Sequence, residues 1–227
     1  MTNATKFIVW DWNGTLLDDT SVVLSAVNKS LEKIRKPVDL AELRRHSAIP
    51  LQQFWRNLGL AEETIVAHQA HLSATFHDHY ESNVAKAALR AGGEALLRQT
   101  RKAGIAHMIL SNHIVAAIES QLARLASHDV FSHILAFADR QEQLAMKMRK
   151  GERLQRFMRD NALHAANGVI VGDTVEEAEI GQQTGLASIV ITGGIHTEEH
   201  LRTAQPDHVV HSLDEMLPIL RTRGLLS

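Results

Sequence analysis

Residues 7–16 read Phe-Ile-Val-Trp-Asp-Trp-Asn-Gly-Thr-Leu, an apolar run that leads directly into polar residues and a glycine. The four apolar residues Phe7–Trp10 are typical of a buried strand. In open parallel sheets, ligands bind beyond the carboxyl ends of the strands, which is where this run places Asp11. We therefore expect Asp11 to take part in chemistry, the alternative being a strand that ends in an Asx turn with Gly14 at positive φ.

Short apolar runs bounded by turn residues alternate with helical stretches over most of the chain. Besides Phe7–Trp10, the expected strands are residues 105–110, 134–137, 168–171 and 188–191. The expected helices between them are residues 94–102, 114–126, 149–161 and 175–184. Alternation of this kind predicts an α/β fold with a parallel sheet covered by helices on both faces.

Residues 18–90 interrupt this alternation, because they show helical periodicity and no convincing strand. The expected helices of this insert are residues 22–36, 40–46, 51–58 and 62–83. The insert follows the first strand directly, so it should lie over that strand's carboxyl end as a lid. We therefore expect an α/β core of residues 1–17 and 91–227 and a helical cap of residues 18–90, with short hinges near residues 17–19 and 89–93.

The composition of the 227-residue chain excludes several classes of function. It has 24 basic and 26 acidic residues, so we expect neither nucleic acid nor an anionic membrane as a partner. Cysteine is absent, which excludes disulfides and thiolate metal sites. The chain shows no apolar run near the roughly 20 residues of a membrane span and no signal-peptide pattern, so we expect a cytoplasmic protein. Its oligomeric state is left open.

Two motifs before residue 112 resemble those of the haloacid dehalogenase superfamily of phosphatases and phosphotransferases. The sequence from Asp11 to Leu16 matches the first motif, Asp-x-Asp-Gly-Thr-Leu, with Asn13 in place of the second acid. The apolar run that ends at Ser111 matches the second motif, a Ser or Thr that closes a strand. A helical insert between these two motifs is what the superfamily calls a C1 cap.

The later part of the chain resembles the superfamily's third and fourth motifs. Lys150, followed by a glycine, is similar to the lysine of the third motif, with Lys147 as the fallback. The sequence Gly-Asp-Thr-Val-Glu-Glu at residues 172–177 matches Gly-Asp-x-x-x-Asp, with Glu177 in place of the last acid. Residues 192–210 resemble more loosely the end of phosphoglycolate-phosphatase-like members, where a last strand and helix complete the sheet.

The resemblance implies a three-layer, Rossmann-like core and hydrolysis of a small phosphorylated metabolite. Asp11 would attack phosphorus and form an aspartyl-phosphate, which divides a difficult displacement into two easier ones. Mg²⁺ would be the cofactor, because it prefers oxygen ligands. The expected catalytic residues are Asp11, Asn13, Ser111 and Lys150. The expected metal-binding residues are Asp11, Asn13 through its backbone carbonyl, Asp173 and Glu177. The expected substrate-binding residues are Thr15, Asn112, Arg45 and His46.

The amide at position 13 departs from the superfamily's phosphatases, whose second acid protonates the leaving oxygen. Asn13 has no titratable proton near neutral pH, and general acid–base help is worth about 10² to 10⁴ in rate. Three outcomes stay open: a substrate with a good leaving group such as an acyl or aryl phosphate, a proton from the lid with His46 as leading candidate, or a weakly active or inactive ligand-binding sensor. A phosphotransferase or a non-phosphatase hydrolase is a further alternative, and non-phosphatase chemistry ranks lower because the dehalogenase version carries Tyr and the phosphonatase version Ala there.

Other polar residues of the insert favour structural roles. The histidines at 68, 71, 77 and 79 lack a clear third ligand, so they predict a polar helix face rather than a metal site. Asp18, Asp19 and Thr20 predict an N-cap for the first lid helix.

Overall fold

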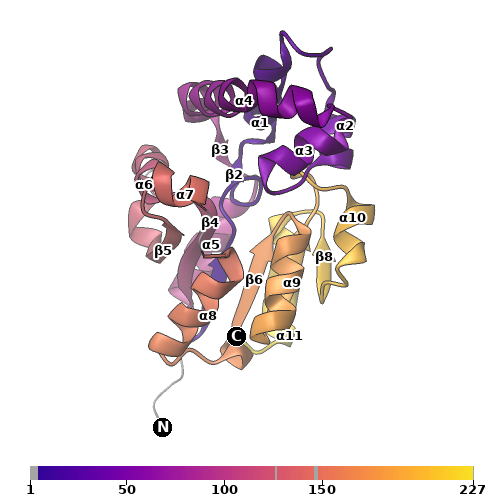
Figure 1. Ribbon diagram of the computed structural model, residues 1–227. Helices are drawn as coiled ribbons and strands as arrows, with labels where there is room; N and C mark the ends of the chain where they lie inside the picture. Colours follow the sequence, from indigo (N-terminus) through magenta and orange to yellow (C-terminus); the bar gives the residue numbers. More distant parts are fainter. Residues whose placement is uncertain (1–4, 126, 146–147, 227) are drawn as a thin grey trace.

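A six-stranded parallel sheet forms the centre of the computed structural model, which describes residues 5–125, 127–145 and 148–226 (Figure 1). The strand order is β5-β4-β1-β6-β7-β8, and every neighbouring pair is parallel. The strands are β1 (Phe7–Trp10), β4 (Ala106–Ile114), β5 (Phe131–Phe137), β6 (Gly168–Gly172), β7 (Ala187–Ile191) and β8 (His208–Val210). The predicted parallel sheet is therefore confirmed.

Helices cover both faces of this sheet. Successive side chains of a strand point to opposite faces, so Phe7 and Val9 pack on one side of β1 while Ile8 and Trp10 pack on the other. The helices on the face of Ile8 and Trp10 are α5 (Gly93–Lys102), α6 (Val115–Arg124) and α11 (Met216–Thr222). Those on the opposite face are α8 (Lys150–Asp160) and α9 (Val175–Thr184), with α10 (Glu198–Thr203) packed beside α9. The predicted three-layer, Rossmann-like core is confirmed.

The order of the strands locates the ligand-binding edge. From β1 the chain moves outward through β4 to β5, and then returns to place β6 on the other side of β1. In open α/β sheets, ligands bind at such a reversal, beyond the carboxyl ends of the strands. Asp11 follows β1 and Asp173 follows β6, so the reversal brings these two acids to one point of the edge.

Four helices between β1 and α5 form a cap with its own apolar core. They are α1 (Thr20–Leu31), α2 (Leu40–His46), α3 (Leu51–Asn57) and α4 (Glu62–Asn83). Leu31, Trp55 and Leu72 are almost fully buried among them. Figure 1 shows these helices over the carboxyl ends of the strands. Although α4 has 22 residues, neither it nor another helix of the described residues has the apolar character needed to cross a membrane.

The connections between cap and core differ from the prediction, which placed no strand between residues 18 and 90. β2 (Leu17–Asp18) and β3 (Ala88–Leu89) pair as a short antiparallel ribbon, so the two expected hinge segments lie side by side. Each strand has two residues, which is too short for a period-2 pattern to appear in the sequence.

Several boundaries also shift from their predicted positions. β4 continues to Ile114 because its last residue pairs with β5 after a register shift, so the next helix begins at Val115. The expected end of that helix, Ala126, lies outside the described residues. The first cap helix ends at Leu31 rather than at residue 36. Short helical segments escaped prediction: α7 (Arg140–Ala145), α10, and the 3₁₀ turns η1 (Val84–Lys86), η2 (His128–Val130), η3 (Ala165–Asn167) and η4 (Leu213–Glu215).

One histidine is enclosed in the apolar core. His107 of β4 is 1% exposed, and its Nδ1 accepts a hydrogen bond of 2.9 Å from Trp10 Nε1. Its Nε2 lies 3.1 Å from Thr100 Oγ1, whose hydroxyl lies 2.7 Å from the Leu96 carbonyl oxygen. Burial, with a smaller effect of Arg101, lowers the pKa of His107 to about 4.

We predict that protonation of His107 weakens the fold in acid. The unfolded histidine takes up a proton as the pH falls below about 6.5, whereas the folded one resists until about pH 4. Between pH 7.5 and pH 5 this residue should therefore remove about 2 kcal/mol from the free energy of unfolding. Urea unfolding of the wild type and His107→Gln at both pH values tests this, and the variant should lose less stability on acidification. Equal losses in the two proteins would contradict the prediction.

Candidate active site

The two acids at the sheet edge share a hydroxyl. Thr15 Oγ1 lies 3.0 Å from Asp11 Oδ2 and 2.9 Å from Asp173 Oδ1, and a hydroxyl has only one proton to donate. The turn that allows this approach depends on Gly14, whose φ is +75°. A Cβ there would lie 2.5 Å from Asp173 Oδ2, so only glycine brings the turn this close to the second acid.

A buried lysine contacts the other carboxylate oxygen of Asp11. Lys150 Nζ donates to Asp11 Oδ1 at 2.6 Å and to Glu177 Oε1 at 2.5 Å. Lys150 lies in the first turn of α8, on the helix face that also buries Leu154 and Met158. A cation is unfavourable at a helix N-terminus, so the two carboxylates offset both the helix dipole and the loss of water. Burial lowers the pKa of Lys150, but Asp11 and Glu177 outweigh it and the pKa is raised.

Glu177 supports this lysine. Its Oε1 accepts from Lys150, while its Oε2 accepts from the amide nitrogen of Thr174 at 3.2 Å and from the hydroxyl at 2.7 Å. The bond from the Thr174 amide is one half of the capping box at the start of α9. Both oxygens of Glu177 thus have partners within the protein, and one of them fixes the Lys150 ammonium beside Asp11.

The buried charges of the site do not balance. Asp11, Asp173 and Glu177 are at most 8% exposed, and Lys150 is the ammonium group that faces two of them. Burial raises the pKa of Asp11 well above its ordinary value, Lys150 opposes this shift, and Glu177 and Asp173 add to it. Burial also raises the pKa of Asp173 to about 6. With the fully buried Asp19 beside the turn, four carboxylates accompany one ammonium, and a divalent cation would reduce this negative excess.

The oxygen donors at the sheet edge are compatible with Mg²⁺. Within the described residues, no group of three or more His, Asp or Glu side chains could hold a metal ion. Mg²⁺ does not require one, because it is commonly bound through one or two carboxylates and completes its octahedron with waters and substrate phosphate. Asp11 and Asp173, joined through the Thr15 hydroxyl, offer the carboxylates, and the first turn offers the Asn13 carbonyl.

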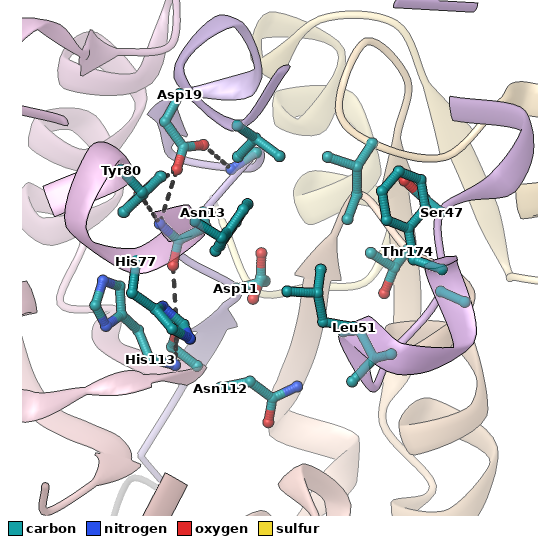
Figure 2. Close-up of a pocket in the computed structure, with 18 of the residues that line it drawn as sticks. Asp11, Asn13, Asp19, Ser47, Leu51, His77, Tyr80, Asn112, His113 and Thr174 are labelled. Atoms are coloured by element: carbon teal, nitrogen blue, oxygen red, sulfur yellow. Dashed lines mark hydrogen bonds between the residues drawn. The ribbon is translucent and has the colours of Figure 1, made fainter. Parts of the chain in front are cut away.

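The side chain of Asn13 is held by residues of the cap (Figure 2). Its Nδ2 donates to Asp19 Oδ2 at 2.9 Å and lies 2.7 Å from Tyr80 Oη at the end of α4. The Tyr80 hydroxyl also donates to Asp19, and the Gly14 amide donates to Asp19 Oδ1 at 2.7 Å. Asp19 occupies the N-cap position of α1 as expected, yet its side chain accepts no bond from that helix. The prediction of a side-chain cap is wrong because this fully buried carboxylate bonds to the active-site turn instead.

The carboxyl end of β4 contributes polar groups on the core side. Ser111 Oγ lies 3.5 Å from Asn13 Oδ1 and accepts from the His113 amide at 3.0 Å. Asn112 Nδ2 donates to Glu176 Oε2 at 3.0 Å. His113 Nε2 lies 3.3 Å from Glu81 Oε1, a carboxylate of the cap. Burial lowers the pKa of His113 to about 4.

A cavity of about 240 Å³ lies between cap and core and brings several expected site residues together. Asp11, Asn13, Ser111, Asn112 and Lys150 line it. The expected residues Thr15, Asp173 and Glu177 lie behind this lining and contact it through hydrogen bonds. Arg45 is exposed, and neither Arg45 nor His46 lines the cavity. The fallback lysine, Lys147, lies outside the described residues.

Some cavity residues were not recognised in the sequence. Asp19 and Tyr80 are distant in the sequence and contact each other only in the folded protein. The sequence signal for Asp19 was its position directly after another acid, Asp18. Arg140 of α7 also lines the cavity, and it donates to His77 Nδ1 at 2.8 Å. His77 was assigned to a polar helix face, but it belongs to the cavity wall.

Comparisons with known proteins agree with this geometry. The family model for haloacid dehalogenase-like hydrolases matches residues 8–191. A phosphoglycolate phosphatase of Cereibacter sphaeroides is 29% identical over 224 residues, covering 96% of this chain and 98% of the relative. A probable phosphatase, IndB, of Dickeya dadantii is 23% identical over 214 residues, covering 92% and 91%. The crystal structure of a predicted phosphatase from Clostridium acetobutylicum superposes with a TM-score of 0.79 at 20% identity, covering 97% and 100%.

We predict that Lys150→Met destabilises the protein by about 3–5 kcal/mol at pH 7.5, because it leaves two buried carboxylates without their partner. The deficit should shrink at pH 5, because Lys150 lowers the pKa of Asp11, so that its loss raises this pKa further and the carboxyl takes up a proton more readily. Chemical denaturation measures both values.

Lys29→Met is the matched control, because Lys29 also pairs with a glutamate, Glu32, at 2.7 Å but with both side chains about half exposed. It should change stability by no more than about 0.5 kcal/mol. Equal effects of the two substitutions would show that Lys150 is not a buried counterion.

Proposed function

The chain belongs to the haloacid dehalogenase-like hydrolase family, and from this premise we propose that it is a Mg²⁺-dependent phosphatase of a small phosphorylated metabolite. The observation that carries the proposal is the position of Asp11. It lines the cavity at the carboxyl end of β1 and is held by the Lys150 ammonium and the Thr15 hydroxyl. Phosphatase relatives that match over nearly the whole chain support the same class of reaction.

Asp11 is the nucleophile in the proposed reaction. One of its carboxylate oxygens forms a bond to phosphorus as the bond from phosphorus to the ester oxygen breaks, and the organic group leaves as an oxyanion with that electron pair. Water then attacks the aspartyl-phosphate at phosphorus, which releases inorganic phosphate and restores the Asp11 carboxylate. Lys150 and Thr15 fix the orientation of Asp11 through both steps.

Neutralising the charge of the phosphoryl group is the main demand of such a reaction. Asp11, Asp173 and the backbone carbonyl of Asn13 would hold Mg²⁺, which supplies positive charge against the phosphoryl oxygens when bound. The Ser111 hydroxyl, which lines the cavity beside Asn13, would donate to a phosphoryl oxygen. Lys150 adds a permanent positive charge, because its pKa is raised.

The amide of Asn13 limits which substrates are turned over quickly. Its Nδ2 is engaged by Asp19 and Tyr80, and it has no proton to give to a leaving oxygen. His46, the sequence-based candidate for that proton, does not line the cavity. We therefore favour a substrate whose leaving group departs without protonation, such as an aryl or acyl phosphate. The alternative favoured by Asn13 is a ligand-binding protein with little turnover.

We predict that the purified protein with MgCl₂ releases phosphate from at least one member of a panel of metabolite, aryl and acyl phosphates. Asp11→Asn should lower this rate by at least about a thousandfold. Acid-quenched wild-type protein should carry a phosphoryl group on the peptide that contains Asp11, detected by mass spectrometry. Asp160→Asn, at a half-exposed surface ion pair, should leave the rate unchanged. Absence of release from the entire panel would overturn the proposal in favour of the ligand-binding alternative.

We also predict that Asn13→Asp lowers stability by about 1–3 kcal/mol at pH 7.5, because it replaces a hydrogen bond to Asp19 with an approach of two carboxylates. It should lower turnover of phenyl phosphate for the same reason. The double variant Asn13→Asp with Asp19→Asn exchanges acid and amide, and it should recover most of the stability. A large gain in turnover from Asn13→Asp alone would instead mark the native protein as a weakened phosphatase.

A further inference from the structure

The wall that the cap presents to the cavity is largely apolar. It includes side chains from α1, α2, α3 and the loop between α2 and α3, opposite the polar floor of Asp11, Ser111 and Lys150. Figure 2 shows Leu51 reaching from the start of α3 toward Asp11. The aliphatic and aromatic residues that the argument uses are Val23, Val27, Leu43, Ile49, Leu51 and Phe54.

The polar groups of the cap that reach the cavity already have partners. Asp19 and Tyr80 bond to each other beside Asn13. The Ser47 hydroxyl donates to the Leu43 carbonyl at 2.8 Å. The remaining two, the side chains of His77 and Glu81, contact Arg140 at one side of the cavity.

The positively charged side chains described in the cavity lining belong to the core rather than to the cap. Among the described residues that line the cavity, the Lys and Arg side chains are Lys150 and Arg140, which belong to α8 and α7. Lys150 is held between Asp11 and Glu177 on the floor. The guanidinium of Arg140 donates to Gln143 Oε1 at 2.6 Å and lies 3.4 Å from Glu81. No described cationic side chain of the cap therefore faces the space above the nucleophile.

We propose that the substrate is a phosphate monoester whose organic group is apolar and of about the size of one aromatic ring. This inference rests on the proposed function and names the substrate class of that site. The phosphoryl group contacts the polar floor, and the organic group packs against Leu51, Phe54 and Val27 of the cap. The cavity of about 240 Å³ is smaller than the roughly 300–1,000 Å³ pockets that enclose drug-sized ligands, which favours a small organic group.

The apolar wall distinguishes this chain's cavity from one built for a carboxylated substrate. An ionised carboxylate that lies against aliphatic side chains loses water without gaining a partner, and that cost is large. The Arg140 guanidinium at the side of the cavity already pairs with the carboxylate of Glu81. An apolar group instead gains from leaving water, by about fourfold in affinity for each methylene that is buried. An aryl phosphate further suits Asn13, because a phenolate departs without protonation.

Binding of phosphonates, which the protein cannot hydrolyse, tests the preference separately from the chemistry. With MgCl₂ present, calorimetry should give a dissociation constant for benzylphosphonate at least about tenfold lower than that for phosphonoacetate, the carboxylated analogue. The same preparation is assayed for phosphate release from phenyl phosphate and from 2-phosphoglycolate.

A charge placed on the cap wall should reverse the preference. Leu51→Lys should weaken benzylphosphonate at least tenfold and strengthen phosphonoacetate. Ile49→Lys, at a residue that is 50% exposed, should act in the same direction with little risk to folding. Val66→Lys is the matched control, because Val66 lies on α4, is 64% exposed and does not line the cavity. It should leave both dissociation constants unchanged.

The possible outcomes separate this inference from the proposed function. Preference for phosphonoacetate, or equal binding of both phosphonates, overturns the apolar substrate class even if phosphate is released from 2-phosphoglycolate. Tight binding of benzylphosphonate that is weakened by Leu51→Lys supports the apolar substrate class, and it stands even if no ester is hydrolysed. In that last case the phosphatase proposal fails by itself.

Discussion

An ammonium group enclosed between two carboxylates organises the catalytic edge of this protein. Lys150 at the start of α8 binds Asp11 after β1 and Glu177 in the first turn of α9, so one cation ties together three separate elements. None of these charged side chains is exposed enough for water to stabilise its charge without a partner. The lysine therefore holds the Asp11 carboxylate in place, while the carboxylates keep the lysine charged. Because Asp173 adds a further buried acid, the edge keeps a negative excess that suits a divalent cation.

The cap is joined to this edge at the point where the family's usual acid is missing. Asn13 bonds to Asp19 before α1 and to Tyr80 at the end of α4, so both ends of the cap meet the active-site turn. Arg44 of α2 adds another contact between cap and core. It donates to the carbonyls of Gly193 and Gly194 at 2.7 and 2.8 Å. An acid at position 13 would face Asp19 directly, so the amide and the buried carboxylate suit each other. We infer that position 13 here serves cap attachment as well as metal binding.

Much of the fold was predictable because the central strands β1, β6 and β7 are short, apolar and buried on both faces. The acids after β1 and β6 were also visible, since each ends such a run and the strand order brings them together. The Asn13, Asp19 and Tyr80 contact was not predictable, because Tyr80 is 67 residues from Asn13 and no local pattern links them. Arg45 and His46 were expected to bind substrate, but they do not line the cavity. In the short helix α2 the sequence did not decide which face turns inward, and the structure buries Leu43 instead.

Magnesium binding tests the central claim, the unbalanced buried charge, most directly. If Asp11 and Asp173 form the cation site, saturating MgCl₂ should stabilise the wild type, by about 2.7 kcal/mol at a hundredfold excess over the dissociation constant. Affinity should fall between pH 7.5 and pH 5.5, because the pKa of Asp173 is raised to about 6 and protons compete with the ion. Asp173→Asn should abolish the stabilisation. Equal stabilisation of the wild type and Asp173→Asn by MgCl₂, or none in either, would contradict the account.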